Sequence, residues 1–309
     1  MTTSNKTLLV LMAVLAVFVS SATAWGAKGH QIVAELAHSN LLPTAQRTVD
    51  TIVSFAAAQG IYANLTDAAV YPDRNRTAGG GTFGSHFINY ADRPDQGKCG
   101  GDALAIPADC NGDKGCVTTA IGKFSRQLAL STPKSVEAAN ALALLIHYIG
   151  DLSQPLHDSG FALGSNQVNA TYNGQLMGGG LHRVWDVEIV DTAIAQSSEG
   201  TYESFLDDLT WTANPLDADL WCILVTDPTN AAGISKCTTQ WAVQAEALNC
   251  KTVYGPKYGG VSADLKATGY ADAVAPVAAR QIQRAGLRLS ALLSKITIGQ
   301  ALGAWGKAK

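Results

Sequence analysis

Hydrophobic residues recur every three or four positions along most of this chain, which is the spacing of a helix with one buried face. The pattern predicts helices over residues 28–40, 44–58, 117–130, 134–150, 181–197, 201–212, 235–250 and 264–294. Thr44 fits a helix start, Ser135 with Glu137 soon after fits another, and Pro155 fits a helix end. The sequence therefore predicts a mainly α protein.

Irregular segments separate these helices. They are a Gly-rich loop at 78–84, a cysteine loop at 96–116 and a Gly/Asn-rich stretch at 158–180. Within the last stretch, residues 168–177 surround an Asn-Gly pair at 173–174, which is typical of a tight β-hairpin turn. No internal repeat or low-complexity linker divides the sequence, so we expect one domain.

The first 24 residues indicate a secretory signal peptide. They carry one charge at Lys6, an apolar run from Leu8 to Val19, and small residues at 22–24. This run is too short to cross a bilayer, and no later stretch reaches the ~20 apolar residues of a membrane helix. We expect a signal peptide over 1–24, an enzyme domain over 25–309, and a secreted, extracellular protein with no membrane span.

Charge and cysteine content add to this picture. Without the signal peptide the chain has 21 basic and 25 acidic residues, so no positive field recruits polyanions from a distance. All six cysteines follow residue 24, and an even number in an oxidising compartment favours disulfides. Cys110 and Cys116 would close a short loop, and the other pairings stay open. Asn64 and Asn169 begin glycosylation sequons in predicted loops.

Histidine and aspartate occur together at helical spacing in two places. His147 and Asp151 are four residues apart, and so are His182 and Asp186. Such a pair presents both side chains on one helix face, which is the geometry for binding one ion. His157 follows the predicted end of the first helix, where the chain can turn its ring back toward the same face.

A single His/Asp pair at this spacing is more often a surface pair than a metal site. Such a surface pair stabilises its helix by ~0.2–0.5 kcal/mol. The stretch ALALLIHYIGDL indicates otherwise, since it places His147 and Asp151 among residues that should be buried. An unpaired buried carboxylate costs several kcal/mol, and a bound cation removes that cost. Two such pairs with His30, His86 and His157 provide ligands for more than one ion.

The motifs together resemble those of a known enzyme family. In order along the chain, the motifs are Trp25 with GH soon after it, PDR, HF, HYIGDLSQPLH and LHRVWD. Their order resembles that of the zinc-dependent single-strand-specific nucleases and 3′-nucleotidases of fungi, plants and protists. The resemblance runs from residue 25 to about 190. It implies a mainly α, single-domain fold of the zinc phospholipase C and single-strand nuclease type.

The resemblance also implies a site for three zinc ions. All nine ligand positions of the family are matched, by Trp25, His30, Asp73, His86, His147, Asp151, His157, His182 and Asp186. One zinc would take Asp73, His86, His147 and Asp151, and the second the α-amine and carbonyl oxygen of Trp25 with His30 and Asp151. The third would take His157, His182 and Asp186. The α-amine is a competent ligand only if the chain is cut at Trp25.

Roles in hydrolysis follow from the same resemblance. Asp151 would act in catalysis as the bridging ligand, and Arg76 matches the arginine that stabilises charge on the phosphate. Phe87 matches the base-stacking residue, which favours unpaired bases. The ordinary alternatives are a solvated loop arginine and a core aromatic. Asn89, placed with Phe87 in substrate binding, stands where many members have an aspartate that helps to orient the attacking water.

We therefore expect a secreted zinc-dependent endonuclease that cleaves single-stranded DNA and RNA to 5′-phosphate products. It would also act on 3′-nucleotides and need no obligate protein partner. Two alternatives stay open. A zinc phospholipase C shares the fold and the three-zinc plan but has Glu where this chain has Asp186, and a secreted zinc-binding protein without turnover would bind metal and hydrolyse nothing.

Overall fold

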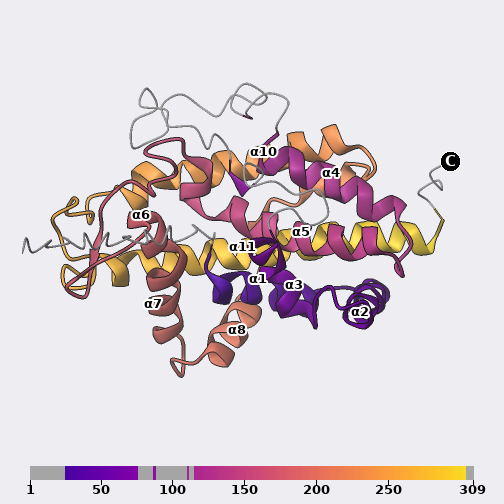
Figure 1. The fold of residues 1–309 in the computed structure, drawn as a ribbon, viewed down its shortest axis with the longest axis horizontal. Helices are drawn as coiled ribbons and strands as arrows, with labels where there is room; N and C mark the ends of the chain where they lie inside the picture. The colour runs from indigo at the N-terminus through magenta and orange to yellow at the C-terminus, as the bar shows by residue number, and fades with distance from the viewer. Residues whose placement is uncertain (1–24, 76–85, 88–109, 111–114, 304–309) are drawn as a thin grey trace, which may run out of the picture.

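The structure is a computed structural model, which describes residues 25–75, 86–87, 110 and 115–303 (Figure 1). The segment predicted to be a signal peptide lies outside these residues, as do the Gly-rich loop at 78–84 and most of the cysteine loop. Arg76 and Asn89 also lie outside them. Helices account for most of the described chain, which confirms the mainly α prediction.

The helices are α1 (Ala27–Ser39), α2 (Pro43–Ala58), α3 (Leu65–Arg74), α4 (Val117–Leu130), α5 (Val136–Ser153), α6 (Gly180–Arg183), α7 (Ile189–Ala195), α8 (Tyr202–Trp211), α9 (Trp221–Val225), α10 (Ala231–Glu246) and α11 (Tyr270–Ala301). Four shorter turns extend or connect them. Two are 3-10 turns, η5 (Pro155–Asp158) and η7 (Pro215–Ala218), and two are π-helical turns, η6 (Val184–Glu188) and η8 (Asn249–Val253).

Helix α3 is absent from the sequence prediction. Asn64, which we expected in a loop, caps this helix, and its side chain accepts a hydrogen bond from the backbone N of Asp67 at 2.8 Å. Pro72 inside the helix and its short length hide the helical pattern. The helix predicted to start at Thr44 begins one residue earlier. Leu42 is the N-cap of α2, and Pro43 occupies its first turn.

The boundaries of the long C-terminal helix differ from the prediction of 264–294. Asp264 instead forms a turn, in which its carboxylate accepts hydrogen bonds from the backbone N of Lys266 and Ala267. Gly269, with φ of 74°, then begins α11, which continues to Ala301. The helix predicted at 235–250 instead runs from Ala231 to Glu246, and the short helix α9 is absent from the prediction. Ser135 caps α5 as predicted by accepting a hydrogen bond from Ala138 N.

The predicted hairpin is confirmed. Strand β1 (Thr171–Tyr172) pairs antiparallel with β2 (Gln175–Leu176), with Thr171 opposite Leu176. Asn173 and Gly174 connect them with φ angles of 50° and 74°. Positive φ at both residues is the geometry of the two-residue turn that Asn-Gly favours.

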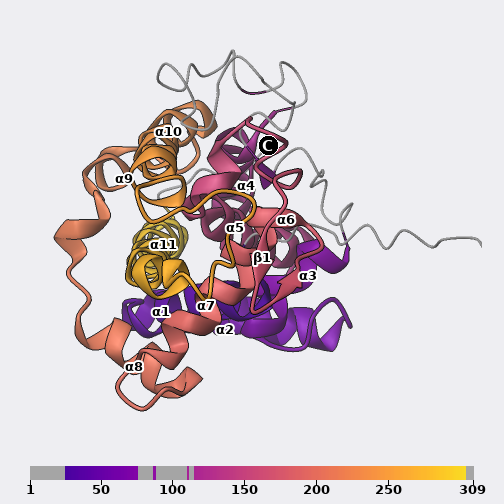
Figure 2. The same ribbon diagram turned by 90° about the vertical axis from the view of Figure 1, so that its left-hand side faces the viewer.

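Helix α5 lies at the centre of the helical packing (Figures 1 and 2). It contacts α1, α2, α3, α4, α10 and α11, while α11 runs along the length of the molecule. Residues 141–153 of α5 are all buried. A helix that is apolar on every side belongs inside a core, so any polar side chain on α5 needs a partner from a neighbouring element.

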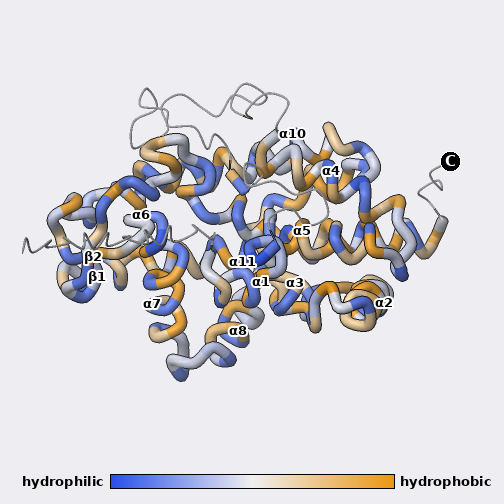
Figure 3. The backbone as a smooth tube through the Cα atoms, in the orientation of Figure 1, coloured by the Kyte–Doolittle hydropathy of each residue, from blue (hydrophilic) through white to orange (hydrophobic). Residues whose placement is uncertain are grey.

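Hydrophobic residues alternate with polar ones along the outer helices (Figure 3). Among the described residues, no helix combines the length and the apolar character needed to cross a membrane. Disulfides join Cys110 to Cys116, as predicted, and Cys222 to Cys237.

Candidate metal centre

Helix α5 positions the first two candidate ligands. His147 and Asp151 are fully buried, and His147 Nε2 lies 3.6 Å from Asp151 Oδ1. Gly150 allows a third ligand to reach them, because a Cβ at this position would lie 2.6 Å from Nδ1 of His30. Glycine inside a helix costs about 1 kcal/mol relative to alanine, and here it makes room for an imidazole from α1.

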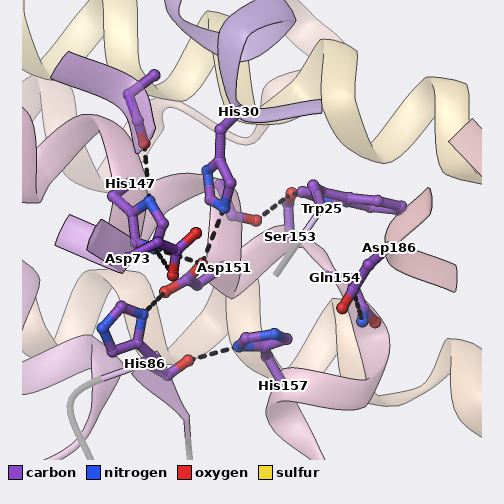
Figure 4. Close-up of polar contacts among 12 residues, drawn as sticks. Trp25, His30, Asp73, His86, His147, Asp151, Ser153, Gln154, His157 and Asp186 are labelled. Atoms are coloured by element: carbon purple, nitrogen blue, oxygen red, sulfur yellow. Dashed lines mark hydrogen bonds and ion pairs between the residues drawn. The ribbon is translucent and has the colours of Figure 1, made fainter. Parts of the chain in front are cut away.

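Four side chains lie around Asp151, and we name the five residues together the Asp151 group: His30, Asp73, His86, His147 and Asp151 (Figure 4). Oδ2 of Asp151 accepts a hydrogen bond from Nδ1 of His86 at 2.8 Å, and Oδ1 lies 3.3 Å from Nε2 of His30. Nε2 of His147 lies 3.4 Å from Oδ1 of Asp73. The Asp151 carboxylate is therefore at the centre of side chains from three helices and residue 86.

Three further side chains, His157, His182 and Asp186, form a second cluster that we name the His182 group. Nε2 of His182 lies 3.1 Å from Nε2 of His157 and 3.4 Å from Oδ2 of Asp186. Asp186 sits in the π-helical turn η6, between α6 and α7. Such turns insert one residue into a helix and occur frequently at functional sites.

Backbone carbonyls orient three of the imidazoles. A carbonyl oxygen only accepts hydrogen bonds, so each of these rings carries a proton on Nδ1 and turns Nε2 toward the other candidate ligands. The three bonds run from His147 to Ala69 O at 2.8 Å, from His157 to His86 O at 2.6 Å, and from His182 to Gly164 O at 2.6 Å. The orientation of these rings is thus set by the fold and needs no ion.

Gln154 orients a carboxylate in the same way, although the sequence analysis gave it no role. Its Nε2 donates to Oδ1 of Asp186 at 2.8 Å, and its Oε1 accepts from the backbone N of Leu156 at 2.6 Å. Gln154 is fully buried. Because Oδ1 is occupied, Asp186 offers Oδ2 to the His182 group.

Trp25 is buried beside both groups (Figure 4). Its indole Nε1 donates to Oγ of Ser153 at 2.6 Å, and the backbone N of Gly26 donates to Asp186 O at 2.7 Å. Gly29 allows the chain to fold back here, since a Cβ would lie 2.6 Å from Cβ of Trp25. The main chain of Trp25 is therefore held at the site from two sides.

The Asp151 group balances its own charges. Burial alone would raise the pKa of Asp151, but the neighbouring imidazoles of His147, His86 and His30 lower it well below its usual value. Burial would likewise lower the pKa of His147, but the carboxylates of Asp151 and Asp73 raise it to about 9. At neutral pH this group contains buried ion pairs.

The His182 group has the opposite character. Burial lowers the pKa of His182 to about 4 and the pKa of His157 well below its usual value. Burial also raises the pKa of Asp186 well above its usual value, against the hydrogen bond from Gln154. At neutral pH both imidazoles are neutral, which is the form that binds a metal.

Several buried atoms lack a hydrogen-bond partner among the described residues. Those that belong to the Asp151 group are Nδ1 and Nε2 of His30, Nε2 of His147 and Oδ1 of Asp151. Three sets of ligand atoms also lie within 4.8 Å of one another, from His30, His147 and Asp151, from Asp73, His86 and His147, and from His157, His182 and Asp186. Imidazole nitrogens and carboxylate oxygens are ordinary zinc ligands, so these residues fit metal ions.

Phe87 packs against the His182 group. Its ring stacks on His157 with centroids 4.3 Å apart and planes within 4°, and its side chain is 1% exposed. This geometry gives Phe87 a packing role beside a candidate ligand. Its role in stacking on a base stays a prediction, as do the roles of Arg76 and Asn89, which lie outside the described residues.

Comparisons with known proteins identify the family of this chain. The family model described as S1/P1 Nuclease matches residues 25–297. Nuclease S1 of Aspergillus oryzae is 30% identical over 280 residues, which cover 88% of this chain and 91% of that protein. Nuclease P1 of Penicillium citrinum is 30% identical over 275 residues, with coverages of 88% and 97%. Endonuclease 1 of Arabidopsis thaliana is 26% identical over 303 residues, with coverages of 95% and 93%. The chain therefore belongs to the S1/P1 nuclease family and is a hydrolase of phosphodiester bonds.

Proposed function

We propose that this protein is a secreted endonuclease that uses three zinc ions to cleave single-stranded DNA and RNA. It leaves 5′-phosphate ends and also removes the phosphate of 3′-nucleotides. The observation that carries the proposal is the pair of buried groups around Asp151 and His182, in which imidazole nitrogens and carboxylate oxygens converge within 4.8 Å of one another. Residues 1–24 act as a signal peptide, and cleavage after residue 24 frees the α-amine of Trp25.

The two groups divide the zinc ligands as the family resemblance implies. The Asp151 group with Trp25 would hold two ions, with Asp151 between them, and the His182 group would hold the third. Zinc lowers the pKa of a bound water toward ~7, which supplies a nucleophile at neutral pH. Two contacts support the ligand role of Trp25: its indole donates a hydrogen bond to Ser153, and the backbone N of Gly26 donates one to Asp186 O.

The chain's other residues act on the substrate. Arg76, two residues beyond α3, would stabilise charge on the phosphate, and Phe87 with Asn89 would bind the base and sugar. A base in a duplex hides its faces, so a stacking residue selects unpaired strands. Asp186, where the phospholipase C alternative has Glu, favours a nucleic acid over a lipid substrate.

Parallel assays test this proposal. Protein that begins at Trp25 is given single-stranded RNA, single-stranded DNA, the matching duplexes, a 3′-nucleotide and phosphatidylcholine, and its metal content is measured by mass spectrometry. We expect three zinc ions per chain, cleavage of both single strands to 5′-phosphate ends, release of phosphate from the 3′-nucleotide, and little action on duplex. A matched sample stripped with chelator should lose activity and regain it with zinc. Lipid cleavage without nucleic-acid cleavage would reverse the substrate assignment.

A further inference from the structure

One short segment is hydrogen-bonded to all three stretches of chain that carry the His182 group. It consists of the π-helical turn η8 (Asn249–Val253) and the next residue, Tyr254, and we name it the 249–254 segment. The turn η8 packs against η5 and α11. None of the three candidate ligands belongs to this segment, so it acts on them through the residues beside them.

The first connection leads to His157. The side-chain amide Nδ2 of Asn249 donates to the carbonyl oxygen of Pro155 at 2.9 Å. Pro155 begins the 3-10 turn η5, and His157 is the third residue of this turn. Asn249 is fully buried, so bulk water does not compete for this hydrogen bond. The bond therefore fixes the backbone two residues before the ligand.

The second connection leads to His182 through an unusual backbone turn. Residues 162–165 all have positive φ angles, between 47° and 66°, although only Gly164 lacks a Cβ. This left-handed conformation is unfavourable for the other three residues. It places the carbonyl oxygen of Gly164 where it accepts the hydrogen bond from Nδ1 of His182 at 2.6 Å. Other contacts must therefore hold the turn in this conformation.

Tyr254 supplies such contacts on both sides of the turn. Its hydroxyl shares a hydrogen bond with Oγ of the fully buried Ser165 at 2.5 Å, and its ring packs edge-on against Phe161 with centroids 5.9 Å apart. The backbone has little room to move, since a Cβ on Gly164 would lie 2.7 Å from Leu156 O. Tyr254 therefore supports the turn whose carbonyl oxygen orients the ligand.

The third connection leads to Asp186 through two buried aromatic residues. The hydroxyl of Tyr270 donates to Val253 O at 2.8 Å and accepts from the indole Nε1 of Trp185, also at 2.8 Å. Trp185 directly precedes Asp186 in η6, and both aromatic side chains are fully buried. Within the described chain, by contrast, the 249–254 segment makes no hydrogen bond to the Asp151 group.

We infer that the 249–254 segment positions all three ligands of the His182 group. The zinc ion that they would bind belongs to the proposed function, on which this inference rests. Metal ligands bind tightly only when surrounding residues hold them in the right mutual geometry. The three ligands come from the separate stretches η5, α6 and η6, and the segment is linked to the flank of each. Asn249 and Tyr254 act directly as positioning residues, and Tyr270 relays the contact to η6.

Zinc competition tests the positioning role. Asn249→Leu, Tyr254→Phe and Tyr270→Phe each remove the polar group of one connection and keep much of the side-chain volume. Protein that begins at Trp25 is loaded with zinc and titrated with a chelator. We expect each variant to bind one of its zinc ions about threefold to tenfold more weakly, as for the loss of one buried hydrogen bond. Tyr254→Phe combined with Tyr270→Phe should weaken that ion by more than either change alone, and the other two ions should bind as in the unmodified protein.

Two controls separate positioning from general stability. Tyr62→Phe removes the hydroxyl of another buried tyrosine, which donates to Ala139 O at 3.1 Å and belongs to neither group. It should lower the melting temperature by an amount similar to that of Tyr254→Phe but leave all three zinc affinities unchanged. In a His182→Ala background, which already lacks the third ion, Tyr254→Phe should change zinc binding no further.

Two results would overturn the positioning role. One is a zinc affinity in the combined variant equal to that of Tyr62→Phe, which would mean that the segment contributes only to the core. The other is equal weakening of all three ions, since the segment would then act on the whole fold. An unmodified protein that binds no zinc would refute the proposed function and the positioning role together. Three zinc ions in the unmodified protein, with no change in the variants, would refute the positioning role alone.

Discussion

The Asp151 group and the His182 group are built from the same residue types but differ in electrostatic character. The Asp151 group combines two carboxylates with three imidazoles, so that burial is offset by ion pairs and the pKa of His147 rises to about 9. The His182 group has one carboxylate, and burial dominates, which lowers the pKa of His182 to about 4. The first group contains charged imidazole and carboxylate side chains without metal, whereas the imidazoles of the second group are neutral at neutral pH.

This difference indicates how the two groups divide the work. An ion that enters the Asp151 group must displace the protons that lie between its imidazoles and its carboxylates. Many candidate ligands of the group would then surround the ion. The His182 group would supply three protein ligands, and an ion with three protein ligands keeps a position open for water or substrate. The His182 group is therefore the better candidate for the site where a phosphoryl oxygen binds.

The largest expected effect comes from removing the charge at the centre of the Asp151 group. Asp151→Asn keeps the shape of the side chain but leaves His30, His86 and His147 without their shared carboxylate. We expect loss of two of three zinc ions and a fall in activity of at least ~10³-fold, beyond the 10–100-fold loss typical of an outer ligand partner. Metal analysis and hydrolysis of single-stranded RNA measure this, with the exposed Asp207→Asn as control. Three retained zinc ions would contradict the central place of Asp151.

The second largest effect should come from blocking the α-amine of Trp25. A protein with Gly-Ser added before Trp25 replaces the α-amine by an amide, which is a poor ligand at neutral pH. We expect loss of one zinc from the Asp151 group, loss of most activity, and an intact His182 group. The comparison is with protein that begins at Trp25, and circular dichroism checks that both are folded. Full activity with three zinc ions in the extended protein would refute the ligand role of Trp25.

Much of the fold could be predicted because helical periodicity is a local property of the sequence. Helix α4 matches its predicted range at both ends, and Ser135 caps α5 through a side chain that the sequence makes visible. Helix α3 was missed because Pro72 and a length of 10 residues leave too little periodic pattern. The position of Asp73 on a helix therefore followed from the structure alone.

The candidate site was predictable in part. His147 and Asp151 stand out because their spacing and apolar neighbours are both local signals. His86 and Asp151 are 65 positions apart in the sequence. No periodic pattern encodes a contact over that separation, so the prediction that these two residues share a site depended on the family resemblance. Gln154 gave no signal, since a glutamine before a proline at a helix end is an ordinary sequence whatever its partner.

Gln154 offers a smaller change that acts on the His182 group alone. Gln154→Ala removes the hydrogen bond to Oδ1 of Asp186 and frees that carboxylate to turn. We expect a 10–100-fold loss in activity or in affinity for one zinc ion, as is typical when the partner of a metal ligand is lost. The two ions of the Asp151 group should stay bound, which zinc titration against a chelator can measure.

Gln127→Ala is the matched control for this variant. Gln127 also donates one side-chain hydrogen bond, to Glu137 O at 2.9 Å, but its partners belong to neither group. The control should keep both activity and zinc affinity. Equal losses in the two variants would mean that Gln154 contributes only to general stability, and loss of zinc from the Asp151 group would mean that the two groups are not independent.

The smallest expected effect separates packing from substrate binding at Phe87. Phe87→Leu keeps an apolar side chain against His157 but removes the aromatic face. If the ring rearranges to stack on a base, KM for single-stranded RNA should rise by about fivefold, which corresponds to ~1 kcal/mol of stacking per base, while kcat and zinc content stay the same. A base can use this ring only by displacing it from His157, because the side chain is 1% exposed. An unchanged KM with weaker zinc binding in the His182 group would show that Phe87 acts only by holding His157.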